Sequence, residues 1–524
     1  MRILTAIIFL SFFTFQLNSQ EQKYWVVFTD KPNTAFDPYT YFDAKAIERR
    51  VIEGLPLSDW YDWPVNEFYI NELKSAGAEL RISSRWLNAA VILANETEID
   101  QIKKMIFVKE VVQSQSQSII CRNENETLGN QSEVNDIQIH KQMELLGQPM
   151  WHGKNLKGKG IRICVNDVGF ESVNTNPVFA HLYKNNQILK TYDFVDNDTT
   201  VYHGGWHGTA VLSCIAGFDN FLPLGLANEA EFLLARTEYN KKEVFAEEEF
   251  WVAAAEWADK NGAQIISSSL GYGEPRYTRD QMNGKTVFIT KAANIAARKG
   301  ILVINAAGNE GDGSWKTIVA PADADSVLTV GGVEPNKSHI SFSSFGPSRD
   351  LRIKPNVCAS GSAYSPTPNK LVYNQGTSFS TPLISGFAAC AWQNNRGLKS
   401  MQLFKEIEKS GHLYPYFDYA HGFGVPQANY FLSQKAEKTS EFVFEKNIDR
   451  NALIIKVNKM ESVKNVVYYH IAKPNNTLKS YFVVSFDTYG ESDAKEIAID
   501  FSKLNVGDIV RVSSEGTVNE YIYN

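Results

Sequence analysis

Short apolar runs alternate with helical stretches between residues 151 and 434, and this alternation limits the folds open to the chain. The runs IRICVND, EFLLART, QIISSSL, GILVINAAG and SVLTVGGV have the length and apolar character of buried strands. Among them lie TAVLSCIAGF, EEEFWVAAAEWADKNG and TKAANIAARKG, which have the composition of helices. Strands that alternate with helices form βαβ units. We therefore predict an α/β domain with a parallel sheet over residues 151–434.

The regions on either side of this domain have different compositions. Residues 20–113 mix strand-like runs such as YWVVFTD with helical ones such as DAKAIERRVIEG, which predicts a small α+β domain. Residues 114–150 are polar, with SQSQS and NENETLGNQSE, and are predicted to form an exposed linker. Residues 435–524 are rich in strand-like runs and poor in helix signals, which predicts a C-terminal β-sandwich-like domain.

The N-terminus has the pattern of a secretory signal peptide over residues 1–19. Arg2 precedes the apolar run ILTAIIFLSFFTF, and the small residue Ser19 lies at the expected cleavage point. The alternative is a buried N-terminal helix. The run is too short to cross a membrane comfortably, and no later run of about 20 apolar residues follows. We therefore expect a secreted or periplasmic protein without a stable membrane span.

Charge and cysteine content argue against two classes of function. The formal net charge is -7 and no basic cluster is present, which argues against a nucleic-acid partner. The five cysteines include no CxxC pair, which leaves little support for a cysteine zinc site or a disulfide framework. Cys164, Cys214 and Cys390 lie in apolar runs and are predicted to be buried small hydrophobic residues.

Four polar residues stand at predicted strand ends or helix starts. Asp167 ends the first strand, although Asp-X-Gly is also an ordinary turn. His207 precedes an apolar helix, with His203 as a rival four residues earlier. Asn309 lies in the small-residue loop AAGNEG, which is also a common kind of loop. Ser378 begins an apolar helix, either as part of a helix start or as a nucleophile.

Taken together, these motifs resemble those of the subtilisin-like serine peptidases, the subtilases. The motifs are VNDVGF, HGTAVLS, AAGNEG and GTSFSTP, in the order Asp…His…Asn…Ser, and the resemblance covers about residues 155–432. It implies that Ser378 attacks the scissile carbonyl and that His207 transfers the proton. It further implies that Asp167 orients the imidazole and that Asn309 donates to the oxyanion.

The same resemblance implies a substrate cleft for a protein or peptide. One wall would be the edge segment Ser269, Leu270 and Gly271, and the other would be Ala306, Ala307 and Gly308. Val319 and Ala320 would lie near the floor of the pocket. Because that floor carries no charge, we expect an apolar or a broad preference. Pro321 is a candidate for a cis peptide bond, as in similar enzymes.

The resemblance extends to partners and cofactors. The α+β segment before the linker is similar in position and size to the inhibitory pro-domains of the family, as found in Bacteroidetes-type bacteria. It would act as an intramolecular inhibitor and be cut off in the linker, the alternative being an accessory domain that stays. No cofactor is required for the chemistry. Structural calcium is common in the family. The acidic stretches DNDTT, PADADS and NEGDG are candidates to bind it, but none has EF-hand spacing, so no calcium site is assigned.

Departures from the family pattern leave one rival function open. Val168 replaces the usual Ser or Thr, Trp206 replaces a small residue, Phe379 replaces Met and Ser380 replaces Ala. A catalytically silent subtilase-like fold used for binding or adhesion is the alternative. The sequence GTSFS lacks the second Gly of the G-x-S-x-G motif, which argues against an esterase. The chain contains no HExxH stretch, which argues against a metalloprotease.

Overall fold

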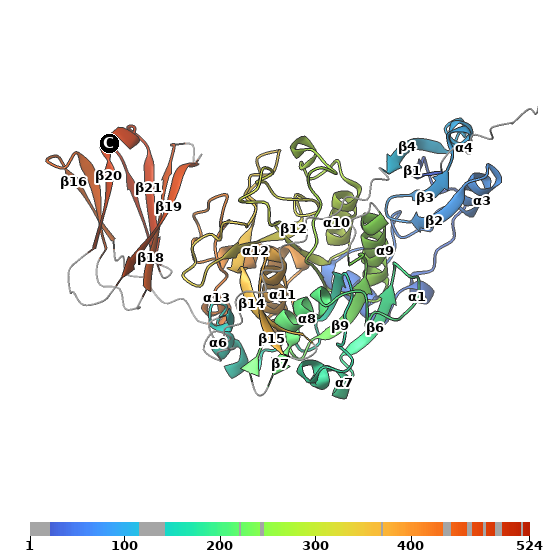
Figure 1. The fold of residues 1–524 in the computed structure, drawn as a ribbon, viewed down its shortest axis with the longest axis horizontal. Helices are drawn as coiled ribbons and strands as arrows, with labels where there is room; N and C mark the ends of the chain where they lie inside the picture. The colour runs from blue at the N-terminus through green and yellow to red at the C-terminus, as the bar shows by residue number, and fades with distance from the viewer. Residues whose placement is uncertain are drawn as a thin grey trace, which may run out of the picture. The chain divides into compact units, whose positions relative to one another are not determined.

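The computed structural model describes residues 21–114, 142–219, 222–240, 246–367, 370–432, 442–457, 464–474, 478–487, 495–514 and 517–524. Figure 1 shows the ribbon with its element labels. The predicted signal peptide and most of the predicted linker lie outside the described residues. The chain divides into two compact units, residues 1–34 with 64–116, and residues 35–63 with 117–524.

The first unit is a four-stranded antiparallel sheet with two helices. Its strands are β1 (Gln22–Phe28), β2 (Glu79–Ser84), β3 (Ala89–Ala94) and β4 (Val108–Ser114), in the order β2-β3-β1-β4. The helices are α3 (Glu67–Ser75) and α4 (Glu96–Ile102). Val26, Phe28, Leu73 and Ile92 are among its buried core residues. The predicted α+β character of this region is confirmed.

The second unit contains a seven-stranded parallel sheet in the order β13-β12-β11-β10-β5-β9-β6. The strands are β5 (Arg162–Asp167), β6 (Ile188–Asp193), β9 (Glu231–Arg236), β10 (Ile265–Ser268), β11 (Leu302–Ala306), β12 (Val327–Val333) and β13 (Val357–Ser360). From β5 the strand order runs one way to β9 and β6 and the other way to β10 through β13. The order thus reverses between β5 and β10, and open α/β sheets bind ligands beyond the C-terminal ends of the strands at such a reversal.

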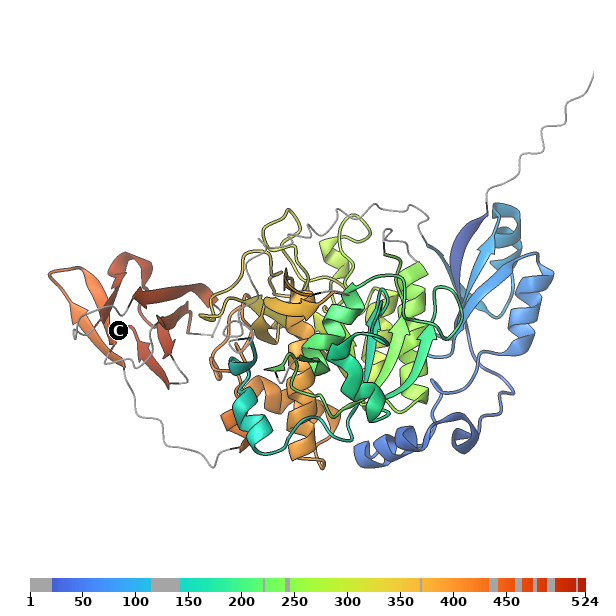
Figure 2. The same ribbon diagram turned by 60° about the horizontal axis from the view of Figure 1, so that its bottom comes forward.

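Helices cover both faces of this sheet (Figure 2). Helices α8 (His207–Ala216) and α11 (Thr377–Asn394) pack on one face, and α9 (Ala246–Lys260) and α10 (Phe288–Arg298) pack together on the other. The predicted parallel α/β sheet is therefore confirmed. Strands β6 and β13 were not anticipated from the sequence.

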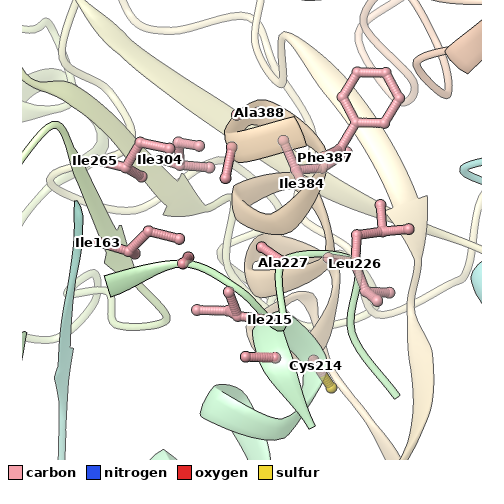
Figure 3. Close-up of a cluster of buried hydrophobic side chains, with 14 of the residues drawn as sticks. Ile163, Cys214, Ile215, Leu226, Ala227, Ile265, Ile304, Ile384, Phe387 and Ala388 are labelled. Carbon is pink, nitrogen blue, oxygen red and sulfur yellow. The ribbon is translucent and has the colours of Figure 1, made fainter. Parts of the chain in front are cut away.

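Helix α11 is buried on nearly all sides, which explains its content of small and apolar residues. Figure 3 shows Ile384, Phe387 and Ala388 of this helix packed with residues of three strands and of α8. Those neighbours include Ile163 on β5 and Ile265 on β10. This packing fixes the N-terminus of α11 relative to the sheet.

Two segments before the sheet also belong to the second unit. Met143 and Leu146 are buried in its core, and α6 (Gln148–Gly153) follows them, so the exposed linker predicted to reach residue 150 ends earlier. Residues 35–63, predicted to be part of the N-terminal α+β domain, group with the sheet and form α1 (Pro38–Tyr41) and α2 (Ala44–Glu53). In both cases the cause is packing against residues far along the chain.

The C-terminal residues form two antiparallel sheets that share a core, as the sandwich prediction requires. One sheet is β16-β17-β20 and the other is β19-β18-β21-β22. Their bounds are β16 (Phe442–Asn447), β17 (Ala452–Val457), β18 (Lys464–Ala472), β19 (Leu478–Asp487), β20 (Lys495–Asp500), β21 (Ile509–Ser514) and β22 (Thr517–Ile522). Leu453 and Ile499 from the first sheet and Val467 and Val510 from the second lie in one buried cluster.

Candidate active site

Asp167 and His207 form a close pair at the C-terminal end of β5. Asp167 is the last residue of β5 and is fully buried, and His207 is the first residue of α8. The Asp167 Oδ1 lies 2.8 Å from the His207 Nδ1 and also accepts a hydrogen bond from the Val168 N–H. A buried carboxylate on Nδ1 fixes the orientation and the tautomer of an imidazole.

Gly208 explains how a helix and a strand come this close. A Cβ at residue 208 would lie 2.9 Å from the Asp167 Cβ and 2.3 Å from the Gly169 carbonyl oxygen. Both distances are too short for a side chain, so glycine is required after the histidine. The HG pair in the sequence is therefore part of the geometry that joins the carboxylate to the imidazole.

The rival histidine, His203, lies in a different environment. Its side chain is 43% exposed and its Nε2 lies 3.5 Å from the Asp193 Oδ2. Asp193, Asp196 and His203 are close enough to share a metal ion. However, the Arg236 guanidinium already donates to both carboxylates. Because this guanidinium supplies the positive charge that a cation would bring, we assign no metal to this cluster.

Ser378 lies in the first turn of α11, and its contacts explain the proline that follows. Its hydroxyl donates to the Ser269 carbonyl at 3.2 Å, while the Ser269 hydroxyl donates to the Ser378 carbonyl at 2.8 Å. In a regular helix the N–H of residue 382 would bond that carbonyl, but Pro382 has no N–H. The Ser269 side chain therefore replaces a missing helix hydrogen bond and ties α11 to the end of β10.

Asn309 holds the start of the same helix through its side chain. Its Oδ1 accepts hydrogen bonds from the N–H and the hydroxyl of Thr377, both at 2.9 Å. A Cβ at Gly376 would lie 3.5 Å from the Asn309 Nδ2. Gly376 has φ +150°, a conformation that favours glycine. The acceptor end of the amide thus points at Thr377 and the donor end points toward the Gly376 side.

One contact links the pair formed by Asp167 and His207 to the start of α11. The ring of His207 lies 5.8 Å, centroid to centroid, from the ring of Phe379, the residue after Ser378. Hydrogen bonds join Asp167 to His207, Ser378 to Ser269, and Asn309 to Thr377. All four polar residues singled out in the sequence therefore lie around the start of α11 or at the end of β5.

Hydrogen bonds from Asn305 join the two predicted walls of the substrate cleft. The Asn305 Nδ2 donates to the carbonyls of Leu270 and Ala306, which links the segment 269–271 to the segment 306–308. The N–H of Gly308 donates to the Thr377 hydroxyl at 3.3 Å. Asn305 and Thr377 were missed from the sequence, although an Asn in the otherwise apolar run GILVINAAG was an available signal.

Val319 lies between these two walls. A Cβ at Gly271 would lie 2.2 Å from its Cγ2, and a Cβ at Gly308 would lie 3.1 Å from both of its methyl groups. The N–H of Val319 donates to the Ala307 carbonyl at 3.2 Å, and its side chain is buried. The next peptide bond but one, Ala320–Pro321, is cis, as the sequence suggested.

Val168, where the family resemblance led us to expect Ser or Thr, has no side-chain hydrogen-bond donor to offer Asp167. The buried Asp167 Oδ2 has no hydrogen-bond partner within the part of the chain that the structure describes. A hydroxyl at residue 168 would be a nearby donor. Among the described residues, the hydrogen bonds to this carboxylate therefore reach Oδ1 alone, from the Val168 N–H and from His207.

Two further expectations are tested by the described residues. Cys164, Cys214, Cys358 and Cys390 are buried free thiols, which confirms the assignment of three of them as small core residues. Among the described residues, no helix is both long enough and apolar enough to span a membrane.

Comparisons with known proteins agree with this geometry. A profile of the "Subtilase family" matches residues 158–424, and one of the "Peptidase S8 propeptide domain, Bacteroidota" matches residues 23–131. The M-protease of Shouchella clausii (strain KSM-K16) is 30% identical over 267 residues, which are 50% of this chain and 62% of the relative. Subtilisin Savinase of Lederbergia lenta is also 30% identical over 267 residues, which cover 87% of that protein.

The chain thus spans less than two thirds of the length of some of the curated relatives that it matches. Among solved structures, the epidermin leader peptide processing serine protease of Staphylococcus aureus aligns with a TM-score of 0.56 at 17% identity. That alignment covers 80% of this chain and 100% of the other, and it supports the fold alone. The family profile covers the whole parallel sheet and the Asp, His and Asn residues together with the serine at the start of α11, so the chain belongs to the subtilase family.

Proposed function

We propose that this protein is a secreted serine endopeptidase that cleaves peptide bonds through Asp167, His207 and Ser378. The observation that carries the proposal is the 2.8 Å contact between the buried Asp167 carboxylate and the His207 Nδ1, with the His207 ring beside the start of α11. A buried acid, an imidazole and a helix-borne hydroxyl in this order are the parts needed for nucleophilic catalysis.

Each group has a defined role in the proposed reaction. The Ser378 Oγ attacks the scissile carbonyl carbon as His207 Nε2 accepts the hydroxyl proton. The tetrahedral intermediate collapses, the C–N bond breaks, and His207 returns that proton to the leaving amine. Water then attacks the acyl-enzyme with His207 again acting as base, which releases the acid and restores Ser378. Asp167 holds the imidazole and stabilises its charged form.

The oxyanion is stabilised by donors at the start of α11. The Asn309 Nδ2 and the backbone N–H of Ser378 would donate to it. The Thr377 contacts fix the Asn309 amide by its oxygen, so its orientation is set before substrate arrives. The positive end of the α11 dipole lies at the same point and favours an anion there.

The proposed substrate is an extended peptide with a small side chain before the cleaved bond. The backbone of Ser269, Leu270 and Gly271 would pair with the peptide, and Ala306–Gly308 would form the opposite wall. The sequence led us to expect an apolar or broad preference. The position of Val319 between Gly271 and Gly308 restricts the proposed preference to small side chains, because its methyl groups fill the space that a long substrate side chain would need.

We also propose that the protein is made as a zymogen. Residues 1–19 would direct secretion and be removed, and the propeptide domain would act as an intramolecular inhibitor until the chain is cut after it. The match of residues 23–131 to a subtilase propeptide profile supports this order of events.

The test is a pair of serine variants in the same helix turn. Ser378→Ala is expected to abolish both peptidase activity and removal of the N-terminal segment, measured by a peptide assay and by intact mass. Ser380→Ala is the matched control, because Ala is the usual residue there in the family, and it should remain active. Retained cleavage by pure Ser378→Ala protein would refute the mechanism.

Labelling separates the peptidase from the alternative, a silent fold used for binding or adhesion. A serine-directed covalent inhibitor should add its mass to a peptide that contains Ser378 in the wild-type protein and not in Ser378→Ala. If the folded wild-type protein takes up no label and cleaves no peptide, the binding function would be the better reading.

A further inference from the structure

Asn305 is a buried polar residue in an otherwise apolar strand, and the reaction proposed above does not use it. It lies on β11, one residue before that strand ends, and its side chain is fully buried. Burial of a side-chain amide costs free energy unless its polar atoms find hydrogen-bond partners. The partners of Asn305 therefore indicate what the residue contributes.

The Asn305 Nδ2 bonds both predicted walls of the substrate cleft, residues 269–271 and residues 306–308. It donates to the Leu270 carbonyl at 2.9 Å and to the Ala306 carbonyl at 3.0 Å. Carbonyl oxygens only accept hydrogen bonds, so these two contacts fix which end of the amide is the nitrogen. The Oδ1 has no hydrogen-bond partner among the described residues. The side chain therefore acts through its NH2 group.

The bond to Leu270 holds the middle of the wall formed by residues 269–271. The Ser269 carbonyl accepts a hydrogen bond from Ser378 on α11, whereas the next carbonyl, that of Leu270, accepts one from Asn305 on β11. After the wall, the N–H of Tyr272 donates to the Ala320 carbonyl at 2.8 Å. Successive residues of this segment are thus held by three different parts of the fold, and Asn305 supplies the central tie.

The sheet offers a close comparison for this amide. Asn166 on β5, Ser268 on β10 and Asn305 on β11 are neighbours in the parallel register. Asn166 is as deeply buried as Asn305, but its Oδ1 accepts from the Cys164 thiol on the same strand, at 3.3 Å. Its Nδ2 has no hydrogen-bond partner among the described residues. Of the two amides, only that of Asn305 bonds the predicted walls.

Few side chains could replace Asn305 in this role. The position requires two hydrogens on one short side chain, because two carbonyls are bonded by the same atom. A Ser or Thr hydroxyl carries one hydrogen and an ionised Asp carries none. A Gln carries the amide on a side chain longer by one methylene, and a fully packed interior resists such an addition.

We propose that Asn305 is a positioning residue that sets the spacing of the two walls and thereby determines how well extended peptides are cleaved. The inference rests on the peptidase function proposed above. An extended peptide would lie between the walls, so its binding and orientation depend on their spacing. A small activated ester has no peptide backbone to place there and needs only the nucleophile, the base and the oxyanion donors. Asn305 should therefore matter for peptides and not for such esters.

The experiment compares two substrates, a peptide anilide with several residues before the cleaved bond and p-nitrophenyl acetate. Each protein is studied after removal of its propeptide, and a serine-directed covalent inhibitor counts the active sites. Asn305→Ala should lower kcat/KM for the anilide about 100-fold, as a displacement of about 1 Å can do. It should leave kcat/KM for the ester within about threefold of the wild type. Asn305→Ser keeps one hydrogen and should lower the anilide value about 10-fold, and it serves if Asn305→Ala folds poorly.

Two control variants separate positioning from loss of stability. Val303→Ala creates a cavity on the same strand and the same face as Asn305, and Val303 has no side-chain hydrogen bond to lose. Asn166→Ala removes the buried amide that does not bond the walls. Both variants should keep the wild-type ratio of the two kcat/KM values, even where the thermal midpoint falls.

The outcomes distinguish this inference from the proposed function. Folded Asn305 variants that keep the wild-type ratio would overturn the inference and leave the peptidase intact. An equal fall for both substrates, matched by Val303→Ala at a similar thermal midpoint, would also overturn it, because the role of Asn305 would then be structural alone. A folded wild-type protein that cleaves neither substrate and takes up no inhibitor would overturn the proposed function, and the inference with it.

Discussion

Substitution of Val319 by Gly tests whether this side chain limits the proposed substrate pocket. Val319 is 4% exposed and its methyl groups fill the space between Gly271 and Gly308. Val319→Gly removes three carbon atoms from that space. If the two segments are the walls of the pocket, the change deepens it by enough to admit a leucine side chain before the scissile bond.

The expected size of the effect follows from the apolar surface that the substrate would bury. A leucine has three more carbon atoms than an alanine, and each buried methylene contributes about 0.8 kcal/mol. The total of about 2.4 kcal/mol corresponds to a rise of roughly 60-fold in the kcat/KM ratio of leucine over alanine substrates. Val319→Ala removes two carbons and should give a smaller rise, of about 15-fold.

The assay compares peptide anilides that differ only in the residue before the cleaved bond, alanine or leucine, with each processed variant. Val303→Ala is the control, because Val303 is equally buried but lies within strand β11. It should alter stability without changing the ratio. An active, folded Val319→Gly enzyme whose ratio stays within about threefold of the wild type would refute the placement of the pocket.

Three further predictions concern the catalytic groups and acid stability. His207→Ala should abolish turnover, whereas His203→Ala should retain it, because only His207 contacts Asp167; rates with a peptide anilide check this. Asn309→Asp keeps the oxygen that Thr377 requires but loses the amide donor, so kcat should fall roughly 100- to 1000-fold with little change in thermal midpoint. Equal kcat in the two proteins would remove Asn309 from the oxyanion site. Burial lowers the pKa of His339 and of His470 from 6.5 to about 4, and His421 adds to the effect at His339. Both stay neutral when folded but bind protons when unfolded, so their stabilisation is complete above about pH 6.5 and is lost as the pH falls toward about 4. Urea unfolding of the Ser378→Ala chain should show about 2 kcal/mol less stability per histidine at about pH 5 than at about pH 7.5. His470→Gln should reduce this slope, and an unchanged slope would contradict the assignment.

The local sequence was sufficient to predict the elements that are buried along their whole length. Strands β5 and β11 are buried on both faces, so their apolar runs stood out. Strand β6 lies at the edge of the sheet, and five of its six residues are partly buried or exposed. Its run ILKTYD is therefore not continuously apolar and did not indicate a buried strand. Helix α2 was visible as a helix, but nothing within its sequence indicated that Arg49 and Arg50 pair with Asp259, more than 200 residues away.

The sequence by itself determined the α/β class, the order of the motifs and the residue types that the proposed chemistry needs, because buried strands, helix starts and tight loops each restrict composition locally. The tertiary structure alone decided that Ser269 replaces the hydrogen bond lost at Pro382 and that residues 35–63 join the unit carrying the candidate active site. Each of these contacts joins segments far apart in the chain. Such contacts form only when the strand order of the sheet and the close approach at glycines bring these segments together. A local sequence pattern does not show which distant segments become neighbours.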